Sequence, residues 1–178
     1  MTKQMTKDSK KLSYILRHHP EEFNCKIDSF GWVLVQDILD NTSFTMDYLK
    51  EIVNEETRYT FNDDFSKIKA FHGHSVKGVI YTNEVVPPLV LYHGTSEENF
   101  EKIKESKMIK GMSRVLVHLS ETKGQAKRIG KRHGKALILV IDCEQMTKDG
   151  IKFYKSEDGV FLTNDFSTDY IKEVLPPL

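Results

Sequence analysis

Apolar residues near the start of the chain recur at the spacing of an amphipathic helix. Leu12, Ile15 and Leu16 fall on one helical face, while the residues around them are mostly polar. Pro20 should end this helix, because a proline disfavours helical geometry at the residue before it. The pattern therefore predicts a first helix with one buried face.

The next segments predict two more helices and then a pair of strands. Residues 31–35 look like a strand after a turn, a short helix begins at 35–39, and another helix covers 45–53. Alternating residues at 58–61 and 68–71 flank a turn-forming Asn-Asp-Asp sequence, which predicts a hairpin. Three helices followed by a two-stranded hairpin suggest a winged helix, a frequent nucleic-acid module.

The second half of the chain alternates apolar runs with a helical stretch. Residues 91–95, 117–120 and 159–162 read as strands, and 137–141 reads as a fully buried strand because it is apolar throughout. Residues 96–105 have the character of a helix. The second half is therefore expected to be a mixture of strands and helices.

The consecutive prolines Pro87 and Pro88 are the best candidate boundary between these halves, because prolines stiffen the chain and stop regular structure. We expect a first lobe at residues 1–86 and a second lobe at residues 89–178. Together they predict an α+β protein with a winged-helix lobe followed by a mixed β lobe.

Composition limits the classes of protein that remain. Lysine plus arginine and aspartate plus glutamate each total 26, so a nucleic acid would be met by a local patch rather than by the net charge. Cys25 and Cys143 are isolated, which argues against a disulfide framework and favours a reducing cytoplasm. Neither a signal-peptide core nor an apolar run of roughly 18 residues is visible. We expect a cytoplasmic protein with no membrane association.

Two histidine motifs carry the most chemical information. His93 and His118 each end a short apolar run, where a strand would bring the imidazole to the rim of a sheet. Ordinary hydrogen-bonded rim histidines would explain either one alone. Gly94 and Thr95 favour a ligand site, because glycine allows close approach to the backbone and threonine adds a hydroxyl and a possible helix cap.

Several cations are candidates for binding phosphate. Arg17 and His18 stand in the last turn of the first helix, where a cation could also simply complement the helix dipole. Arg58 begins a strand and points away from Tyr59, and Arg114 precedes the strand that carries the second histidine motif. Solvated surface charges would explain each one separately. Together they are notable, since a guanidinium matches a phosphate with two parallel hydrogen bonds.

Two other polar segments are less specific. Residues 123–135 carry only basic titratable side chains, which fits a solvated helix face, or a phosphate held by the glycines of 130–134. His72 and His74 have no carboxylate or cysteine near them in the sequence, so we reject zinc there and expect a loop that supports the site. No dinucleotide-binding, P-loop or hydrolase-elbow motif occurs.

Several short motifs, taken in order, are more specific than any one of them. They are Leu12–His18, Ile27–Asp28, Gly31–Val33, Arg58–Tyr59, Gly73–Ser75, Leu91–Thr95, Arg114, Val117–Ser120 and Asp158–Thr163. In this order and spacing they resemble the RNA 2′-phosphotransferase family (the KptA type), over nearly the whole chain beyond residue 9.

The resemblance implies a winged-helix lobe that grips 2′-phosphorylated RNA and an ADP-ribosyltransferase-like lobe that holds NAD as co-substrate, with no metal. Such enzymes remove an internal 2′-phosphate from RNA, as at a splice junction of tRNA. The phosphate attacks the nicotinamide ribose and expels nicotinamide. The ribose 2″-hydroxyl then attacks phosphorus and releases 2′-hydroxyl RNA and ADP-ribose 1″,2″-cyclic phosphate. We expect the chain to act as a monomer.

The resemblance also assigns residues to the two substrates. The catalytic phosphate site would be formed by Arg17, His18, Arg58 and Arg114. The NAD site would be lined by His93, Gly94, Thr95, His118, Ser120, Arg132 and Val160. Departures from the family pattern at Lys69, His72, Asp158 and Phe161 remove none of these residues.

Two alternatives remain open at this point. One is a mono-ADP-ribosyltransferase of nucleic acid or protein that stops after the first step. Such enzymes are expected to use a glutamate on the third strand, where this chain has Val160, with Glu157 in the preceding turn. The other is a catalytically silent RNA-binding module, which the presence of all the expected phosphate-site cations argues against.

Overall fold

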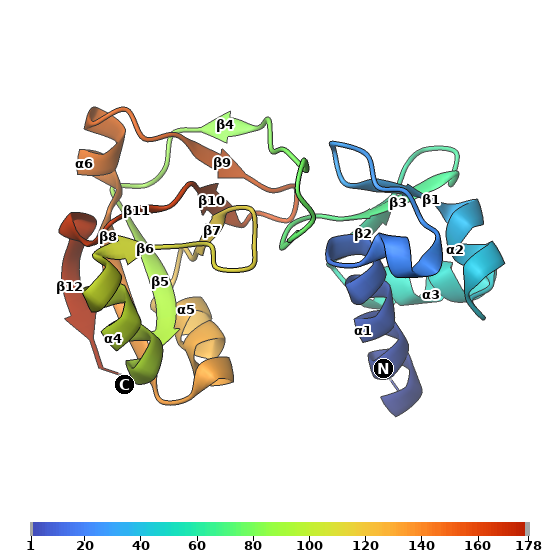
Figure 1. Cartoon of the computed structure of the whole chain (residues 1–178), viewed down its shortest axis with the longest axis horizontal. Helices are drawn as coiled ribbons and strands as arrows, with labels where there is room; N and C mark the ends of the chain where they lie inside the picture. The colour runs from blue at the N-terminus through green and yellow to red at the C-terminus, as the bar shows by residue number, and fades with distance from the viewer. Residues whose placement is uncertain (1, 177–178) are drawn as a thin grey trace. The chain divides into compact units, whose positions relative to one another are not determined.

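Three helices and one antiparallel sheet form the N-terminal part of the computed structural model, which describes residues 2–176 (Figure 1). The helices are α1 (Lys3–Arg17), α2 (Val35–Asn41) and α3 (Met46–Glu55). The strands are β1 (Trp32–Leu34), β2 (Tyr59–Phe61) and β3 (Lys67–Ala70), in the order β1-β3-β2. The predicted helices and hairpin are therefore confirmed, and a third strand joins the hairpin.

Helix α1 begins and ends where its sequence requires. The Thr2 hydroxyl accepts a hydrogen bond from the Met5 amide and caps the first turn. Leu12, Ile15 and Leu16 are fully buried, and each contributes about 1.5–3 kcal/mol through removal of apolar surface from water. The helix ends at Arg17, in the turn before the proline, so this arginine stands at its C-terminus.

The rest of the described chain contains nine strands and three helices. The strands are β4 (Glu84–Val85), β5 (Val90–Ser96), β6 (Met108–Ile109), β7 (Val117–Leu119), β8 (Ala136–Asp142), β9 (Phe153–Lys155), β10 (Phe161–Thr163), β11 (Phe166–Ser167) and β12 (Ile171–Leu175). The helices are α4 (Glu97–Ser106), α5 (Lys123–Gly130) and α6 (Cys143–Lys148). The sheets are antiparallel, in the orders β4-β9-β10-β7, β12-β8-β5 and β11-β6.

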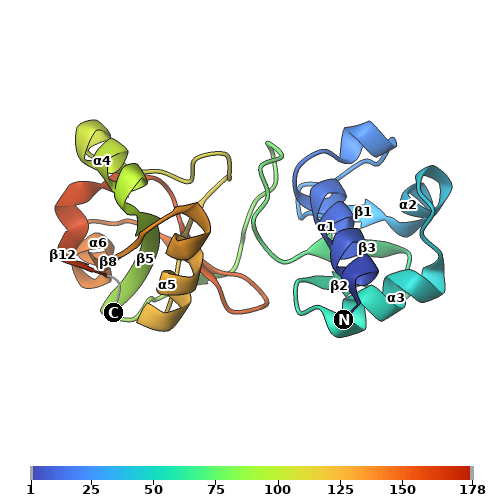
Figure 2. The same cartoon turned by 90° about the horizontal axis from the view of Figure 1, so that it is seen from below.

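Strands β5 and β7 belong to different sheets, and the backbones of Tyr92 and Ser120 join them. Each of these two residues donates its amide to the carbonyl of the other, at 2.9 and 2.8 Å. In the two views of Figures 1 and 2, helices α4 and α5 lie on either side of β5. His93 and His118 stand in the middle of β5 and β7. The expectation that they end their strands was wrong, because both strands continue past the histidine in register with a partner.

The described chain separates into two structural units. One runs up to Tyr81 and includes Ser113–Val115, and the other consists of Thr82–Met112 and the chain from Leu116 onward. Each has its own apolar core. The first core includes Leu12, Val33, Ile38, Leu49 and Ile68. The second includes Leu91, Ile109, Leu139, Phe153 and Phe161.

The α+β class is confirmed by this mixture of helices and antiparallel sheets. Pro87 and Pro88 lie between β4 and β5, and β4 pairs with β9 of the second unit. The division into an RNA-binding lobe at 1–86 and an NAD-binding lobe at 89–178 stays a prediction. Among the described residues, no helix combines the length and the apolar character needed to cross a membrane.

Candidate active site

Ser75 holds His18 at the C-terminal end of α1. The Nδ1 atom of His18 lies 2.9 Å from the Ser75 hydroxyl, and the Ser75 amide donates to the carbonyl of Arg17 at 2.9 Å. The loop at 73–75 is therefore fixed to the helix end through both backbone and side chain. The loop therefore supports His18, and the place of His18 in the site stays a prediction.

Gly73 lies against the Arg17 side chain. A Cβ atom at this position would lie 3.5 Å from Nη1 and 3.6 Å from Cζ of Arg17, and the residue has a φ of 85°, a conformation that favours glycine. The Nε and Nη2 atoms of Arg17 are shielded from solvent. The guanidinium thus lies along the glycine backbone rather than extending freely into water.

His74 anchors the segment that carries Arg114. Its imidazole is buried, its Nδ1 atom lies 2.8 Å from the Tyr81 hydroxyl, and its carbonyl accepts a hydrogen bond from the Val115 amide at 2.9 Å. Burial, reinforced by the charge of Arg17, lowers the pKa of His74 to about 4. The buried imidazole therefore fixes His74 through Tyr81, and the His74 main-chain carbonyl ties Val115, next to Arg114, to the first unit.

Arg17, His18 and Arg114 form one electrostatic cluster. Partial burial lowers the pKa of His18, and the positive charges of Arg17 and Arg114 lower it further. His18 is consequently neutral at pH 7, while the guanidinium groups remain charged. Such a cluster favours a bound anion, because the anion offsets the repulsion between the cations.

Arg58 has a different environment from the one predicted. Its side chain is only 36% exposed, and it forms hydrogen bonds to the Glu56 carboxylate and the Ser9 hydroxyl instead of pointing into solvent as a strand charge. Burial opposes ionisation of Glu56, but hydrogen bonds from Arg58 and Ser9 outweigh it and lower the pKa of the carboxyl. Arg17 adds to this effect, so Glu56 responds to both arginines.

In the second unit, main-chain carbonyls orient both candidate histidines. His93 donates from Nδ1 to the His118 carbonyl at 3.2 Å, and His118 donates from Nδ1 to the Leu116 carbonyl at 3.1 Å. A carbonyl can only accept, so Nδ1 carries the proton in each neutral ring and Nε2 carries the lone pair. The hydrogen bond from the His93 ring to the His118 carbonyl thus brings the two histidine motifs side by side, and their role in binding NAD stays a prediction.

Gly94 is explained by helix packing. A Cβ atom at this position would lie 1.9 Å from the carbonyl oxygen of Ala126, so the backbone of α5 occupies the space beside the glycine. The expectation that this glycine admits a ligand is wrong on that side of the strand. Thr95 does not cap the following helix either, because the hydroxyl of Ser96 accepts the Asn99 amide at 3.2 Å.

The remaining predicted residues differ in their surroundings. Ser120 is buried, and its backbone pairs with that of Tyr92. Val160 lies directly before β10 and donates its amide to the Ser156 hydroxyl at 2.9 Å. Arg132 is exposed in the 3₁₀ turn Lys131–His133.

Gly130 packs against Thr95, since a Cβ there would lie 2.6 Å from the Thr95 carbonyl oxygen. This side of the glycine is therefore unsuited to wrapping a phosphate.

Sequence reasoning missed the partners that hold the phosphate-site candidates. Glu56 is two residues from Arg58, but Ser9 is 49 residues away, and no sequence pattern links it to this ion pair. Ser75 belonged to a recognised motif, yet its hydrogen bond to His18 became visible only in the folded structure.

Within residues 2–176, no three histidine, cysteine, aspartate or glutamate side chains gather as a metal site would require.

Comparison with known proteins places the chain in a family. A sequence model of the RNA 2′-phosphotransferase, Tpt1 / KptA family matches residues 3–165. A probable RNA 2′-phosphotransferase of Fusobacterium nucleatum is 44% identical over 90% of this chain and 94% of its own length. Similar proteins of Burkholderia pseudomallei and Pseudomonas fluorescens, with the same description, are 37% and 38% identical over 94% and 97% of this chain, and over 94% and 99% of their own lengths.

The fold and the site define an α+β protein with a cationic cluster in one unit and a pair of oriented histidines in the other. The chain belongs to the RNA 2′-phosphotransferase family, and it is therefore a transferase of the class that uses NAD to remove a 2′-phosphate from RNA.

Proposed function

We propose that the first unit binds an internal 2′-phosphate of RNA and that the second unit binds NAD. The observation that carries the first assignment is the cluster of Arg17, His18 and Arg114, held by Ser75 and His74. The three helices and the β2–β3 hairpin support a winged-helix role in gripping RNA. We further propose that the chain works as a monomer in the cytoplasm, which is compatible with two free, buried cysteines.

The chemistry suits a site built from arginines. A phosphate dianion is already a nucleophile, so its attack on the nicotinamide ribose requires positioning rather than a strong base. In the second step, the ribose 2″-hydroxyl attacks phosphorus and charge develops on the phosphoryl oxygens. Fixed donors aimed at such charge contribute roughly 3 kcal/mol each. Arg17, Arg58 and Arg114 would supply these donors.

His18 adds a neutral imidazole to this site. The Ser75 hydroxyl lies against Nδ1 and fixes the orientation of the ring, while the lowered pKa keeps the ring unprotonated at pH 7. A neutral imidazole beside arginines can accept a proton and return it. His18 would therefore assist the proton transfers of the second step.

The second unit offers groups that fit a dinucleotide sugar. NAD supplies the glycosidic bond that breaks when nicotinamide leaves. The His118 carbonyl holds the His93 ring through Nδ1, and this oriented imidazole would lie against the ribose of NAD. Ser120, directly after β7, and Thr95 on β5 provide buried hydroxyls, and Arg132 and Val160 complete the proposed lining.

A defined RNA tests this proposal. An end-labelled oligonucleotide with one internal 2′-phosphate is incubated with the protein, with and without NAD, beside the same RNA lacking the phosphate. We expect NAD-dependent conversion to 2′-hydroxyl RNA with release of nicotinamide and ADP-ribose 1″,2″-cyclic phosphate. ADP-ribose that stays on the RNA or on protein would favour the mono-ADP-ribosyltransferase instead, and binding without NAD consumption would favour a silent RNA-binding module.

Variants connect the activity to the site. Arg114→Ala should lower the rate by roughly 10²–10³-fold, the loss typical of one removed oxyanion donor. Arg128→Ala is the matched control, since Arg128 is an exposed arginine of α5 outside the cluster. Equal activity of the two variants would contradict the phosphate assignment.

A further inference from the structure

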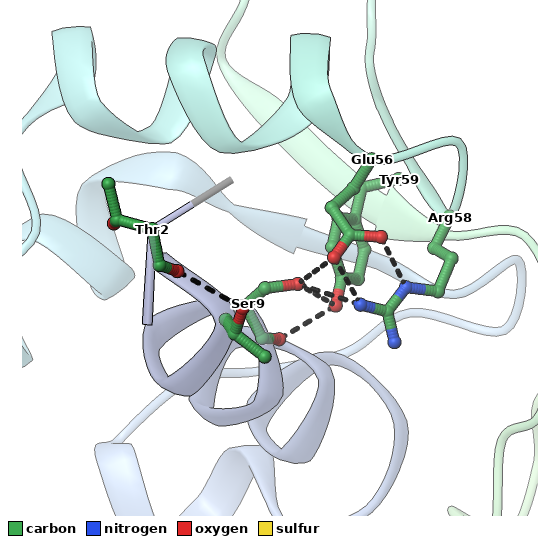
Figure 3. A network of polar contacts seen from close by, with 6 residues as sticks. Thr2, Ser9, Glu56, Arg58 and Tyr59 are labelled. Atoms are coloured by element: carbon green, nitrogen blue, oxygen red, sulfur yellow. Dashed lines mark hydrogen bonds and ion pairs between the residues drawn. The ribbon is translucent and has the colours of Figure 1, made fainter. Parts of the chain in front are cut away.

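The Arg58 guanidinium is held along one edge by the carboxylate of Glu56 (Figure 3). Nε of Arg58 donates to Oε2 of Glu56 at 2.9 Å, and Nη2 donates to Oε1 at 2.5 Å. The Glu56 side chain is only 14% exposed. This bidentate pair fixes the plane of the guanidinium as well as its position.

Ser9 of α1 completes the arrangement. Its hydroxyl donates to Oε1 of Glu56 at 3.0 Å and accepts from Nη2 of Arg58 at 2.9 Å. Tyr59 secures this part of α1, because its hydroxyl donates to the Ser9 carbonyl at 2.7 Å. The serine side chain is buried, so water does not compete with these bonds. Residues from α1, from the end of α3 and from β2 therefore meet at one ion pair.

This arrangement uses only part of the guanidinium. Of its five N–H donors, the Nε donor and both Nη2 donors are engaged by Glu56 and Ser9. Nη1 has no hydrogen-bond partner within the part of the chain that the structure describes, and Figure 3 shows the third guanidinium nitrogen directed away from Ser9 and Glu56. One nitrogen of a partly exposed, immobilised arginine thus remains for a ligand.

The charge of Glu56 also affects the neighbouring cations. Hydrogen bonding to Glu56 raises the pKa of Arg58, although burial opposes it. The charge of Arg17 acts on the same carboxylate. Glu56 therefore offsets the repulsion between Arg17 and Arg58 before a phosphate binds. It contacts Nε and Nη2 of Arg58 and leaves Nη1 for a ligand.

We propose that Glu56 is a positioning residue for phosphate transfer, which with Ser9 locks the Arg58 guanidinium so that Nη1 faces the 2′-phosphate of the RNA. This inference rests on the proposed function, since it requires Arg58 to contact the phosphate. A free arginine would have to lose side-chain freedom when RNA binds. In this chain the freedom is already lost on folding, which is the condition for effective stabilisation of a transition state.

The test is a single-turnover time course on labelled 2′-phosphorylated RNA with saturating NAD, resolved on a gel. Glu56→Gln removes one acceptor and the charge, and we expect the second step to slow roughly 10–100-fold, as when an orienting group is lost. The ADP-ribosylated RNA intermediate should then accumulate. Glu56→Asp keeps the charge and should recover part of the rate. Glu55→Gln, at an exposed neighbour on α3, is the matched control and should behave as wild type.

The ratio of the two step rates separates positioning from loss of fold. A partly unfolded variant lowers the amplitude of both steps without changing that ratio, whereas a misplaced Arg58 slows the second step selectively. Glu56→Gln with a wild-type ratio of rates would overturn the proposal. So would loss of the first step alone.

A double-mutant cycle shows whether Glu56 acts through Arg58. In the Arg58→Ala background, Glu56→Gln should cause much less loss than in wild type, because the group it positions is gone and only its charge toward Arg17 remains. Additive losses would overturn the inference. Arg58→Ala with wild-type rates would refute the phosphate role of Arg58 and the inference with it. Absence of turnover by the wild-type chain would instead refute the proposed function, so the failures are distinguishable.

Discussion

The hydroxyl of Ser75 lies 2.9 Å from Nδ1 of His18, across a separation of 57 residues in the chain. The end of α1 also positions this serine, because the Ser75 amide donates a hydrogen bond to the Arg17 carbonyl. A short loop and a helix terminus therefore determine the orientation of the imidazole together.

Ser75→Ala should slow the reaction while leaving the fold intact. Loss of one hydrogen bond of this kind costs about 0.5–1.5 kcal/mol, which corresponds to roughly a 2–13-fold lower rate. Steady-state kinetics with 2′-phosphorylated RNA measures the effect, and Ser43→Ala, at an exposed serine, serves as the control. Unchanged kinetics in Ser75→Ala would show that the bond has no part in orienting His18.

Gly94→Ala should destabilise the second unit. The added methyl would lie 1.9 Å from the Ala126 carbonyl oxygen, so α5 has to move away from β5. We expect a loss of about 3 kcal/mol or more in the free energy of unfolding, measured by denaturant titration. Gly124→Ala is the matched control, because nothing lies within 4 Å of a Cβ at that position of α5. Equal stability of the two variants would contradict this packing.

The local features of the fold were predictable from the sequence, because they depend on neighbouring residues. Helix α1 follows from the spacing of Leu12, Ile15 and Leu16, and the proline after it marks its end. The β2–β3 hairpin follows from alternation around a polar turn. Such patterns report which face of an element is buried, and this is decided within a few residues.

The site was predictable only as a set of residue types. The resemblance identified Arg17, His18, Arg58 and Arg114 as candidates, but it did not give their partners. The bonds of Ser75 to His18 and of Ser9 to Arg58 join residues 57 and 49 positions apart, and they depend on how the elements pack. Gly94 shows the converse case, since a glycine assigned to ligand approach is required by helix packing.

His74 should make the stability of the first unit depend on pH. Its pKa is about 4 in the folded chain and near 6.5 when exposed, so between these values only the unfolded state takes up the proton. The free energy of unfolding therefore falls as pH drops from 6.5 towards 4, by about 3 kcal/mol at most, at ~1.36 kcal/mol for each pKa unit.

His74→Gln isolates this contribution, because glutamine does not titrate. The stability difference between wild type and His74→Gln, from denaturant titrations, should shrink by about 3 kcal/mol between pH 7 and pH 4. His133→Gln, at an exposed histidine, controls for the loss of a histidine elsewhere. A difference that stays constant with pH would show that folding does not lower the pKa of His74.

Turnover should persist in excess EDTA. The proposed phosphate site consists of arginines and a neutral histidine, and arginine side chains can neutralise a phosphate without a divalent ion. The measurement compares rates in EDTA with rates in added Mg²⁺ or Mn²⁺. Loss of activity on chelation, restored by a divalent ion, would refute the prediction.

Glu157→Ala should keep most of the activity. Glu157 is exposed in the turn before β10, and we expect Val160 to stand where a glutamate-dependent transferase orients its acceptor. An RNA phosphate carries its own charge and needs no such glutamate to activate it. The rate of 2′-phosphate removal by Glu157→Ala is measured beside Arg114→Ala, which should be strongly impaired. A thousandfold loss in Glu157→Ala, about 4 kcal/mol of transition-state stabilisation, would instead support a glutamate-dependent ADP-ribosyltransferase.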